Sequence, residues 1–260
     1  MRKTQNRSVV IALLNLLAVV ALQTALARHF NLQESNSAEF YHELGLERFR
    51  SGRYEEAIEA FATAVQLKPT WAEAHNDLGM SYSSIKRLPD AVECFKRAVS
   101  LSPKYALAYY NMGRTYRDLH QYSESTAAYL TAIRIKPDYA AAYNNLGVTY
   151  EAEGRYAEAT NAFREAIVLQ PRMAEAYQNL GDLAYRLGNM KTALEVFKLA
   201  ERIMPDSAET HFNLGMTYIM LGDKRNAQLE YKKLKSTNPV LADKLQRIIY
   251  KDKLIDVRDK

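Results

Sequence analysis

The prolines of this chain follow a fixed period. Six of the seven stand 34 residues apart, and these six are Pro69, Pro103, Pro137, Pro171, Pro205 and Pro239. A constant period of about 20–50 residues is typical of repeat architectures, in which copies of one supersecondary unit stack on one another. The spacing therefore predicts a stack of equal units in place of a domain built from unrelated elements.

The glycines follow the same period. When proline is given position 32, the six units cover residues 38–71, 72–105, 106–139, 140–173, 174–207 and 208–241. All ten glycines then occupy one of two positions. At position 8 they are Gly45, Gly79, Gly113, Gly147, Gly181 and Gly215, and at position 15 they are Gly52, Gly154, Gly188 and Gly222.

This pattern predicts a helical hairpin in each unit, with helix A over roughly positions 1–14 and helix B over roughly positions 16–30. Glycine at position 15 suits the left-handed residue that ends many helices, and proline stops helix B. Glycine at position 8 lies inside helix A, where it costs about 1 kcal/mol relative to alanine. We therefore expect it to allow close approach of the aromatic residue at position 24 of helix B.

The pattern resembles the tetratricopeptide repeat. The segment YNNLGVTY at 143–150, followed by AEATNAF at 157–163 and by Pro171, matches that family's signature, with tyrosine in place of its tryptophan. The resemblance covers residues 38–241 and implies an all-α, right-handed superhelical solenoid of six helix hairpins. Residues 242–260 place Leu245, Ile248 and Ile249 on one helical face, which predicts a capping helix and tail.

The resemblance also implies that helix A lines a concave groove. Position 6 would then face a partner, and its asparagines are Asn111, Asn145, Asn179 and Asn213. Each amide has a donor and an acceptor that can bind a peptide backbone. Alternatively, these amides bond only between neighbouring helices. The polar middle of the groove adds the partner-binding candidates Tyr110, Arg114, Arg117 and Asn144.

The last unit presents an apolar set to the same groove, made of Phe212, Met216, Ile219 and Met220. Such a patch can dock an amphipathic helix or a hydrophobic peptide end. The chain's own tail, with Leu254, Ile255 and Val257, is an equally good occupant.

The first 27 residues predict a membrane leader. Residues 1–8 are basic, and the apolar run 9–27 would extend about 28 Å as a helix, close to the roughly 30 Å of a bilayer core. The run ends in an A-x-A arrangement at Ala27, so a cleaved signal peptide and an uncleaved anchor both remain open. In either case we expect residues 28–37 to be a linker and the repeats to be extracytoplasmic, in the periplasm of a bacterium.

Other chemistry is sparse in this sequence. The net charge is +5, but the leader contributes three basic residues and no acid, so 32 basic and 30 acidic residues remain. That balance argues against nucleic-acid binding. The single Cys94 excludes an internal disulfide and a multi-cysteine zinc site. His75 and His211 stand at position 4, where the other units have tyrosine, and are predicted to be packing residues. No catalytic motif, cofactor or metal site is expected.

The sequence thus favours a non-enzymatic scaffold or assembly factor that binds a peptide segment of a partner protein in the concave groove. The alternatives are a regulatory or substrate-recruiting subunit of a separately encoded enzyme, such as a glycosyltransferase, and a self-assembling architectural repeat protein.

Overall fold

The computed structural model describes residues 37–256 and their side chains up to Tyr250. The predicted leader and Val257 lie outside the described residues. The described chain is entirely α-helical, as the sequence predicted, and it divides into two compact units, one ending at Pro103 and the other beginning at Lys104. No helix within residues 37–256 combines the length and the apolar character needed to cross a bilayer.

The first unit contains two hairpins. Their helices are α2 (Ala38–Arg50), α3 (Tyr54–Leu67), α4 (Ala72–Ser84) and α5 (Leu88–Leu101). Each A helix packs against its own B helix, and α3 also packs against the next A helix, α4. Phe61, Ala57 and Leu78 form a buried cluster that joins the two hairpins.

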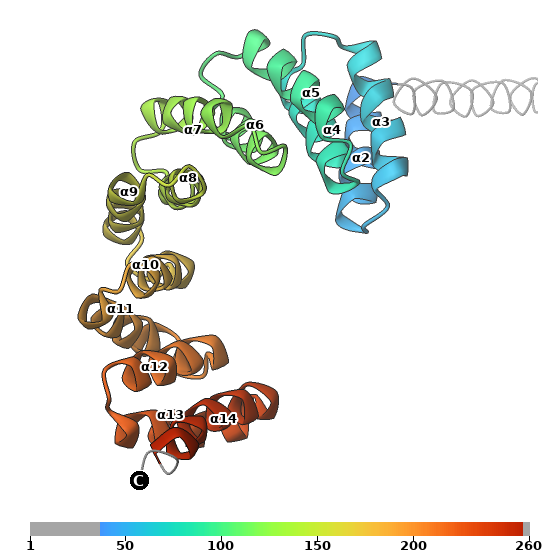
Figure 1. Ribbon diagram of the computed structural model, residues 1–260. Coiled ribbons are helices and arrows are strands. Elements are labelled where there is room, and N and C mark those ends of the chain that lie inside the picture. Colours follow the sequence, from blue (N-terminus) through green and yellow to red (C-terminus); the bar gives the residue numbers. More distant parts are fainter. Residues whose placement is uncertain (1–36, 257–260) are drawn as a thin grey trace, which may run out of the picture. The chain divides into compact units, whose positions relative to one another are not determined.

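The second unit contains four hairpins and a last helix (Figure 1). The helices are α6 (Ala106–Asp118), α7 (Tyr122–Ile135), α8 (Ala140–Ala152), α9 (Tyr156–Leu169), α10 (Ala174–Arg186), α11 (Met190–Ile203), α12 (Ala208–Met220), α13 (Lys224–Thr237) and α14 (Pro239–Asp256). Successive hairpins pack on one another, and the A helices α6, α8, α10 and α12 contact one another in order. We call the surface formed by these four helices the A-helix face.

Five of the six glycines at position 8 lie against the aromatic ring at position 24, as the sequence predicted; the exception is Gly215, which faces Leu245 instead. A Cβ on Gly147 would lie 2.6 Å from Cε1 of Phe163, so the fully buried ring packs directly on the helix backbone. Gly154 has a φ of +76°, which suits the turn between α8 and α9. In two other repeats this left-handed position is held by Lys86 and His120.

The last helix begins earlier than the sequence predicted. The capping helix was expected within residues 242–260, but α14 already starts at Pro239. Proline is well placed in the first turn of a helix, where its missing N–H has no partner to lose. Leu245 and Ile249 are buried against α12 and α13, and the nearest side chain to Gly215 is Leu245. This helix therefore covers the side of the sixth hairpin on which no further repeat packs.

Tyr129 occupies position 24, where four other repeats have phenylalanine, and its buried hydroxyl has no hydrogen-bond partner within the described chain. Replacing Tyr129 with phenylalanine should raise the free energy of unfolding by about 1–2 kcal/mol, because the desolvation of an unpaired hydroxyl is removed. Urea unfolding measures the change. The matched variant Tyr231→Phe, at the same position of the sixth repeat but half-buried, should be nearly neutral. A destabilised Tyr129→Phe protein would contradict this reading.

Candidate partner-binding site

The predicted asparagine ladder lies along the A-helix face, and the amides of Asn145, Asn179 and Asn213 each reach the preceding A helix. Asn145 on α8 donates from Nδ2 to Oη of Tyr110 over 3.0 Å, and its Oδ1 accepts from Nη1 of Arg117 over 2.8 Å; both partners belong to α6. Asn111 is 6% exposed and Asn144 is 4% exposed. The ladder therefore joins neighbouring A helices, and Asn111 and Asn144 offer little surface to a partner.

The same connection continues toward the end of the chain. Asn179 on α10 donates from Nδ2 to Oδ1 of Asn144 over 2.9 Å. Asn213 on α12 donates from Nδ2 to Oδ1 of Asp182 over 2.8 Å. These bonds use the amide nitrogens, and the Oδ1 atoms of Asn179 and Asn213 accept no hydrogen bond from the described side chains. Their contact with a partner stays a prediction.

The other polar candidates lie at the start of the second unit. Tyr110 is half-buried, with its ring centroid 5.0 Å from that of Tyr139. Arg114 is exposed and places its guanidinium 6.0 Å from the Tyr110 ring centroid. Arg117 is engaged by Asn145 and by Asp118. Arg114 is thus the candidate in this group with a free approach from solvent.

Three of the four apolar candidates on α12 pack partly against the chain itself. Phe212, Met216 and Ile219 pack against the cluster that contains Leu245 and Ile249 of α14. Lys244 on α14 also places its Nζ 5.1 Å from the ring centroid of Phe212. This contact comes from the capping helix α14, so the two occupants that the sequence left open, a partner segment and the tail with Leu254, Ile255 and Val257, both stay predictions. Met220 is 57% exposed and remains accessible.

The side chains of Leu254 and Ile255, which the sequence also suggested for this role, lie outside the described side chains, as Val257 does.

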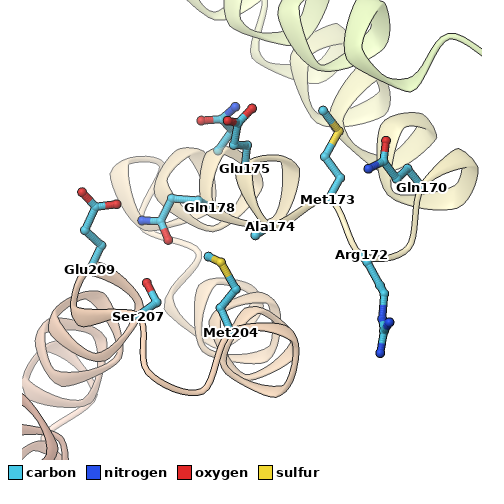
Figure 2. Close-up of a pocket in the computed structure, with 10 residues that line it drawn as sticks. Gln170, Arg172, Met173, Ala174, Glu175, Gln178, Met204, Ser207 and Glu209 are labelled. Atoms are coloured by element: carbon cyan, nitrogen blue, oxygen red, sulfur yellow. The ribbon is translucent and has the colours of Figure 1, made fainter. Parts of the chain in front are cut away.

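Three hollows adjoin one another on the A-helix face. The largest has a volume of about 570 Å³ and lies where α10 and α12 begin. Figure 2 shows Gln178 of α10 and Glu209 of α12 among the residues that line it, with Ser207 and Met204 below Gln178 in this view. Its lining residues are Gln170, Arg172, Met173, Ala174, Glu175, Gln178, Asn179, Met204, Ser207 and Glu209.

The other two hollows follow along the same face. One, of about 320 Å³, is lined by Glu151, Asn179, Asp182, Tyr185 and Arg186. The next, of about 140 Å³, is lined by Asp182, Tyr185, Phe197, Phe212, Asn213 and Met216. Asn179 is shared by the first two, and Asp182 and Tyr185 are shared by the second and third. The hollows therefore form one continuous surface, which we call the α10–α12 groove.

Asp182 lies at the centre of this groove with neutral partners only. Its carboxylate accepts hydrogen bonds from Gln178 and Asn213, and no lysine or arginine within the described side chains pairs with it. Burial raises the pKa of Asp182 above its ordinary value, and the Glu209 carboxylate adds to the increase, against the hydrogen bond from Gln178. Nearby, Arg186 forms an ion pair with Glu151.

The groove is acidic although the whole chain is basic. Four carboxylates line it, from Glu151, Glu175, Asp182 and Glu209, against the two guanidinium groups of Arg172 and Arg186. Its repeat position placed Asp182 in the polar middle of the predicted groove, but the partner-binding candidates did not include it. The available signal was its position: Asp182 is the one acidic residue at position 9, where the other units have leucine, methionine, arginine or valine.

The one cysteine does not offer a nucleophile. Cys94 on α5 is partly buried, and burial raises the pKa of its thiol to about 12, with smaller contributions from Asp90 and Glu93. The thiol is therefore protonated at neutral pH, whereas nucleophilic cysteines need the thiolate.

Comparisons with solved structures find similar solenoids. PilW, described as a widely conserved type IV pilus biogenesis factor, is 22% identical with a TM-score of 0.71, over 82% of this chain and 98% of PilW. PilF of Pseudomonas aeruginosa is 20% identical with a TM-score of 0.69, over the same shares of both chains. MamA is 27% identical with a TM-score of 0.60, over 67% of this chain and 96% of MamA. A search among curated proteins found no match.

Family models match the repeats directly. The model described as TPR repeat matches residues 45–86, 81–119 and 113–154, and two described as tetratricopeptide repeat match residues 151–208 and 208–240. Together these matches extend from residue 45 to residue 240 and include helical hairpins of both compact units. The chain therefore belongs to the tetratricopeptide-repeat family.

Proposed function

We propose that this protein is a non-enzymatic scaffold or assembly factor that binds a peptide segment of a partner protein in the α10–α12 groove. The observation that carries the proposal is Asp182, a half-buried carboxylate with neutral partners at the meeting point of two hollows. A partner that supplies a cation would restore the charge balance of this site. We therefore expect the bound segment to contain a lysine or an arginine.

The lining residues suggest how such a segment is held. Tyr185, Phe212 and Met216 border the hollow next to Asp182, and they can cover the aliphatic part of a basic side chain while Asp182 binds its charged end. The free amide oxygens of Asn179 and Asn213 can accept backbone N–H groups of the peptide. Glu175 and Glu209 add attraction for further basic residues.

We further propose that the protein works on the outer side of the cytoplasmic membrane, either anchored by residues 9–27 or released after cleavage near Ala27. This part of the proposal rests on the amino-acid sequence of the leader. An assembly role in the cell envelope agrees with the description of PilW as a pilus biogenesis factor. Similarity at that identity extends to the fold alone, so the groove carries the proposal for a partner.

The second candidate function is a regulatory or substrate-recruiting subunit of a separately encoded enzyme, such as a glycosyltransferase. It uses the same groove, and it differs in what is bound together with the peptide. Purification of the native complex followed by an assay for sugar transfer separates the two, because only a recruiting subunit should bring a transferase activity with it.

A displayed peptide library tests the proposed specificity. The unchanged protein should select peptides enriched in lysine or arginine, and Asp182→Asn should bind the selected peptides about tenfold or more weakly, because a desolvated charge pair is lost. Affinity should also decrease as the pH is lowered through the raised pKa of Asp182, because protonation removes the negative charge.

The control is Glu158→Gln, which removes an exposed carboxylate on the B helix α9, away from the groove, and should leave binding unchanged. The proposal is wrong if the selected peptides show no preference for basic residues, or if Asp182→Asn and Glu158→Gln bind them equally well.

A further inference from the structure

Three departures from the repeat meet at one place in the second unit. Position 23 is alanine, cysteine or valine in the first five repeats, but it is Glu230 in the sixth. Position 28 is valine or isoleucine in the first four repeats, but it is Glu201 in the fifth. Position 4 is tyrosine in four repeats, but it is His211 in the sixth. The three residues belong to α13, α11 and α12, and their side chains converge.

The cluster is compact and buried. Nδ1 of His211 lies 2.8 Å from Oε2 of Glu230 and 3.7 Å from Oε1 of Glu201. One ligand atom from each residue lies within 4.8 Å of the other two. His211 is 3% exposed and Glu230 is 5% exposed. Among the described residues, this group combines a histidine with two carboxylates at distances that a single ion can span.

The stability of the fold does not explain why carboxylates occupy these positions. A buried carboxylate at a position that accepts alanine elsewhere in the same chain is costly unless it is paired. Lys233 now pairs with both carboxylates, with Nζ 2.6 Å from Oε1 of Glu201 and 3.0 Å from Oε1 of Glu230. Its side chain is 45% exposed, so it can leave the cluster for solvent.

The histidine is held as a metal-binding histidine usually is. Nε2 of His211 lies 2.7 Å from the backbone oxygen of Pro205. An Nε2–H that donates to this oxygen fixes the ring and leaves Nδ1 directed at the two carboxylates, which is the common outer-shell arrangement around a metal-bound imidazole. His75 makes the corresponding contact with the backbone oxygen of Pro69 over 3.1 Å. The residues that correspond to Glu230 and Glu201 are Cys94 and Val65 there, so His75 has no carboxylate at either position.

We propose that Glu201, His211 and Glu230 form a binding site for a divalent transition metal of the zinc type, and that the metal replaces the ammonium group of Lys233. One imidazole nitrogen and two carboxylate oxygens suit zinc, which takes ligands at about 2.0–2.1 Å in tetrahedral geometry. Two ligand atoms of a tetrahedral zinc ion lie about 3.3 Å apart. The distances from Nδ1 of His211 to the carboxylate oxygens of Glu230 and Glu201, 2.8 and 3.7 Å, lie on either side of that value. Two carboxylates also balance the charge of one dication.

This site lies at the junction of α11, α12 and α13, and it is independent of the peptide-binding proposal. A bound ion would join the B helix of the fifth repeat to both helices of the sixth. The expected consequence is a metal-dependent increase in the stability of this end of the second unit, since an ion that binds only the folded state stabilises it.

Titration of the chelator-treated full-length protein with Zn²⁺ tests the proposal, by calorimetry and by thermal unfolding. We expect one ion per chain and a higher melting temperature with zinc than without it. The absorption spectrum of the Co²⁺ form should show the intense visible bands of a four-coordinate ion. Lys233→Met should tighten binding, because the competing cation is gone.

The repeat itself supplies the loss-of-binding variants. Glu230→Ala and the double change His211→Tyr with Glu230→Ala restore the residues found at these positions in other repeats, so both proteins should fold. Each should weaken zinc binding by about 100-fold or more. The matched control His75→Tyr changes the histidine of the second repeat and should bind zinc as the unchanged protein does.

Two results would overturn the proposal. One is the absence of saturable Zn²⁺ binding up to about 1 mM, which would leave the cluster as an ion network held by Lys233. The other is binding that Glu230→Ala leaves unchanged or that Lys233→Met weakens, which would locate the ion elsewhere on the chain.

Discussion

Replacing Phe163 with alanine should lower the free energy of unfolding of the second unit by about 3–5 kcal/mol. The Phe163 ring is fully buried between α8 and its neighbours, and it lies directly on the helix backbone at Gly147. Removing it leaves a cavity that the facing backbone cannot fill, because Gly147 has no side chain to move into the space. Equilibrium unfolding in urea, followed by circular dichroism, measures the loss.

The close contact also predicts a reversal of sign at Gly147. In the unchanged protein, Gly147→Ala should destabilise by about 1–3 kcal/mol, because the new Cβ would overlap a ring that has no room to withdraw. In the Phe163→Ala background the same change should stabilise by about 1 kcal/mol, because alanine is the better helix former and the space is empty. An equal effect of Gly147→Ala in both backgrounds would show that the ring does not require the glycine.

Replacing Leu245 with aspartate should detach α14 and cost about 4 kcal/mol or more, because the change combines the loss of a buried leucine with the burial of a carboxylate. Leu245 is fully buried against α12, where it is the nearest side chain to Gly215. The sixth hairpin would then expose Phe212, Met216 and Ile219. We expect early proteolytic cleavage in α14 and concentration-dependent association.

The control for this prediction is Val240→Asp. Val240 lies on the same helix but is 79% exposed, so the same change of chemistry should leave melting and proteolysis nearly unaltered. If Leu245→Asp melts at the temperature of the Val240→Asp protein, then α14 does not cap the sixth hairpin.

The helices and their order could be predicted from the sequence because the same glycine and proline positions recur in the repeats. The glycine at position 15 and the proline at position 32 mark the ends of helices through local backbone geometry, which the residue type determines. The exception is Pro239, which starts α14. Whether a proline ends one helix or begins the next depends on what packs after it, and here that is the burial of Leu245 and Ile249.

The candidate site could be predicted only in part. Helical periodicity places position 6 on the A-helix face, but it does not show that the amide nitrogens of Asn145, Asn179 and Asn213 bond to the preceding A helix. That depends on which side chains the neighbouring repeat presents. For the same reason, the buried Asn144 was predicted to be available to a partner.

The ionic cluster was missed for a different reason. Glu201, His211 and Glu230 come from three helices, and their spacing along the chain matches no metal-binding motif. His211 was predicted to be a packing residue, and its contact with the backbone oxygen of Pro205 agrees with that role. The sequence does show that each of these three residues differs from the residue usual at its repeat position. That difference points to a site only when the structure shows that the three side chains meet.

The measurement that tests the central claim most directly is site-specific photo-crosslinking of the full-length protein in its native host. The probe belongs at position 178, because Gln178 borders the largest hollow and contacts Asp182, whereas Asn144 is buried. A second probe at the exposed Glu158 of α9 is the control. We expect one discrete adduct from position 178 that is lost with Asp182→Asn, and none from position 158. A strong adduct from position 158, with none from position 178, would show that the α10–α12 groove is not the surface on which this protein binds its partner.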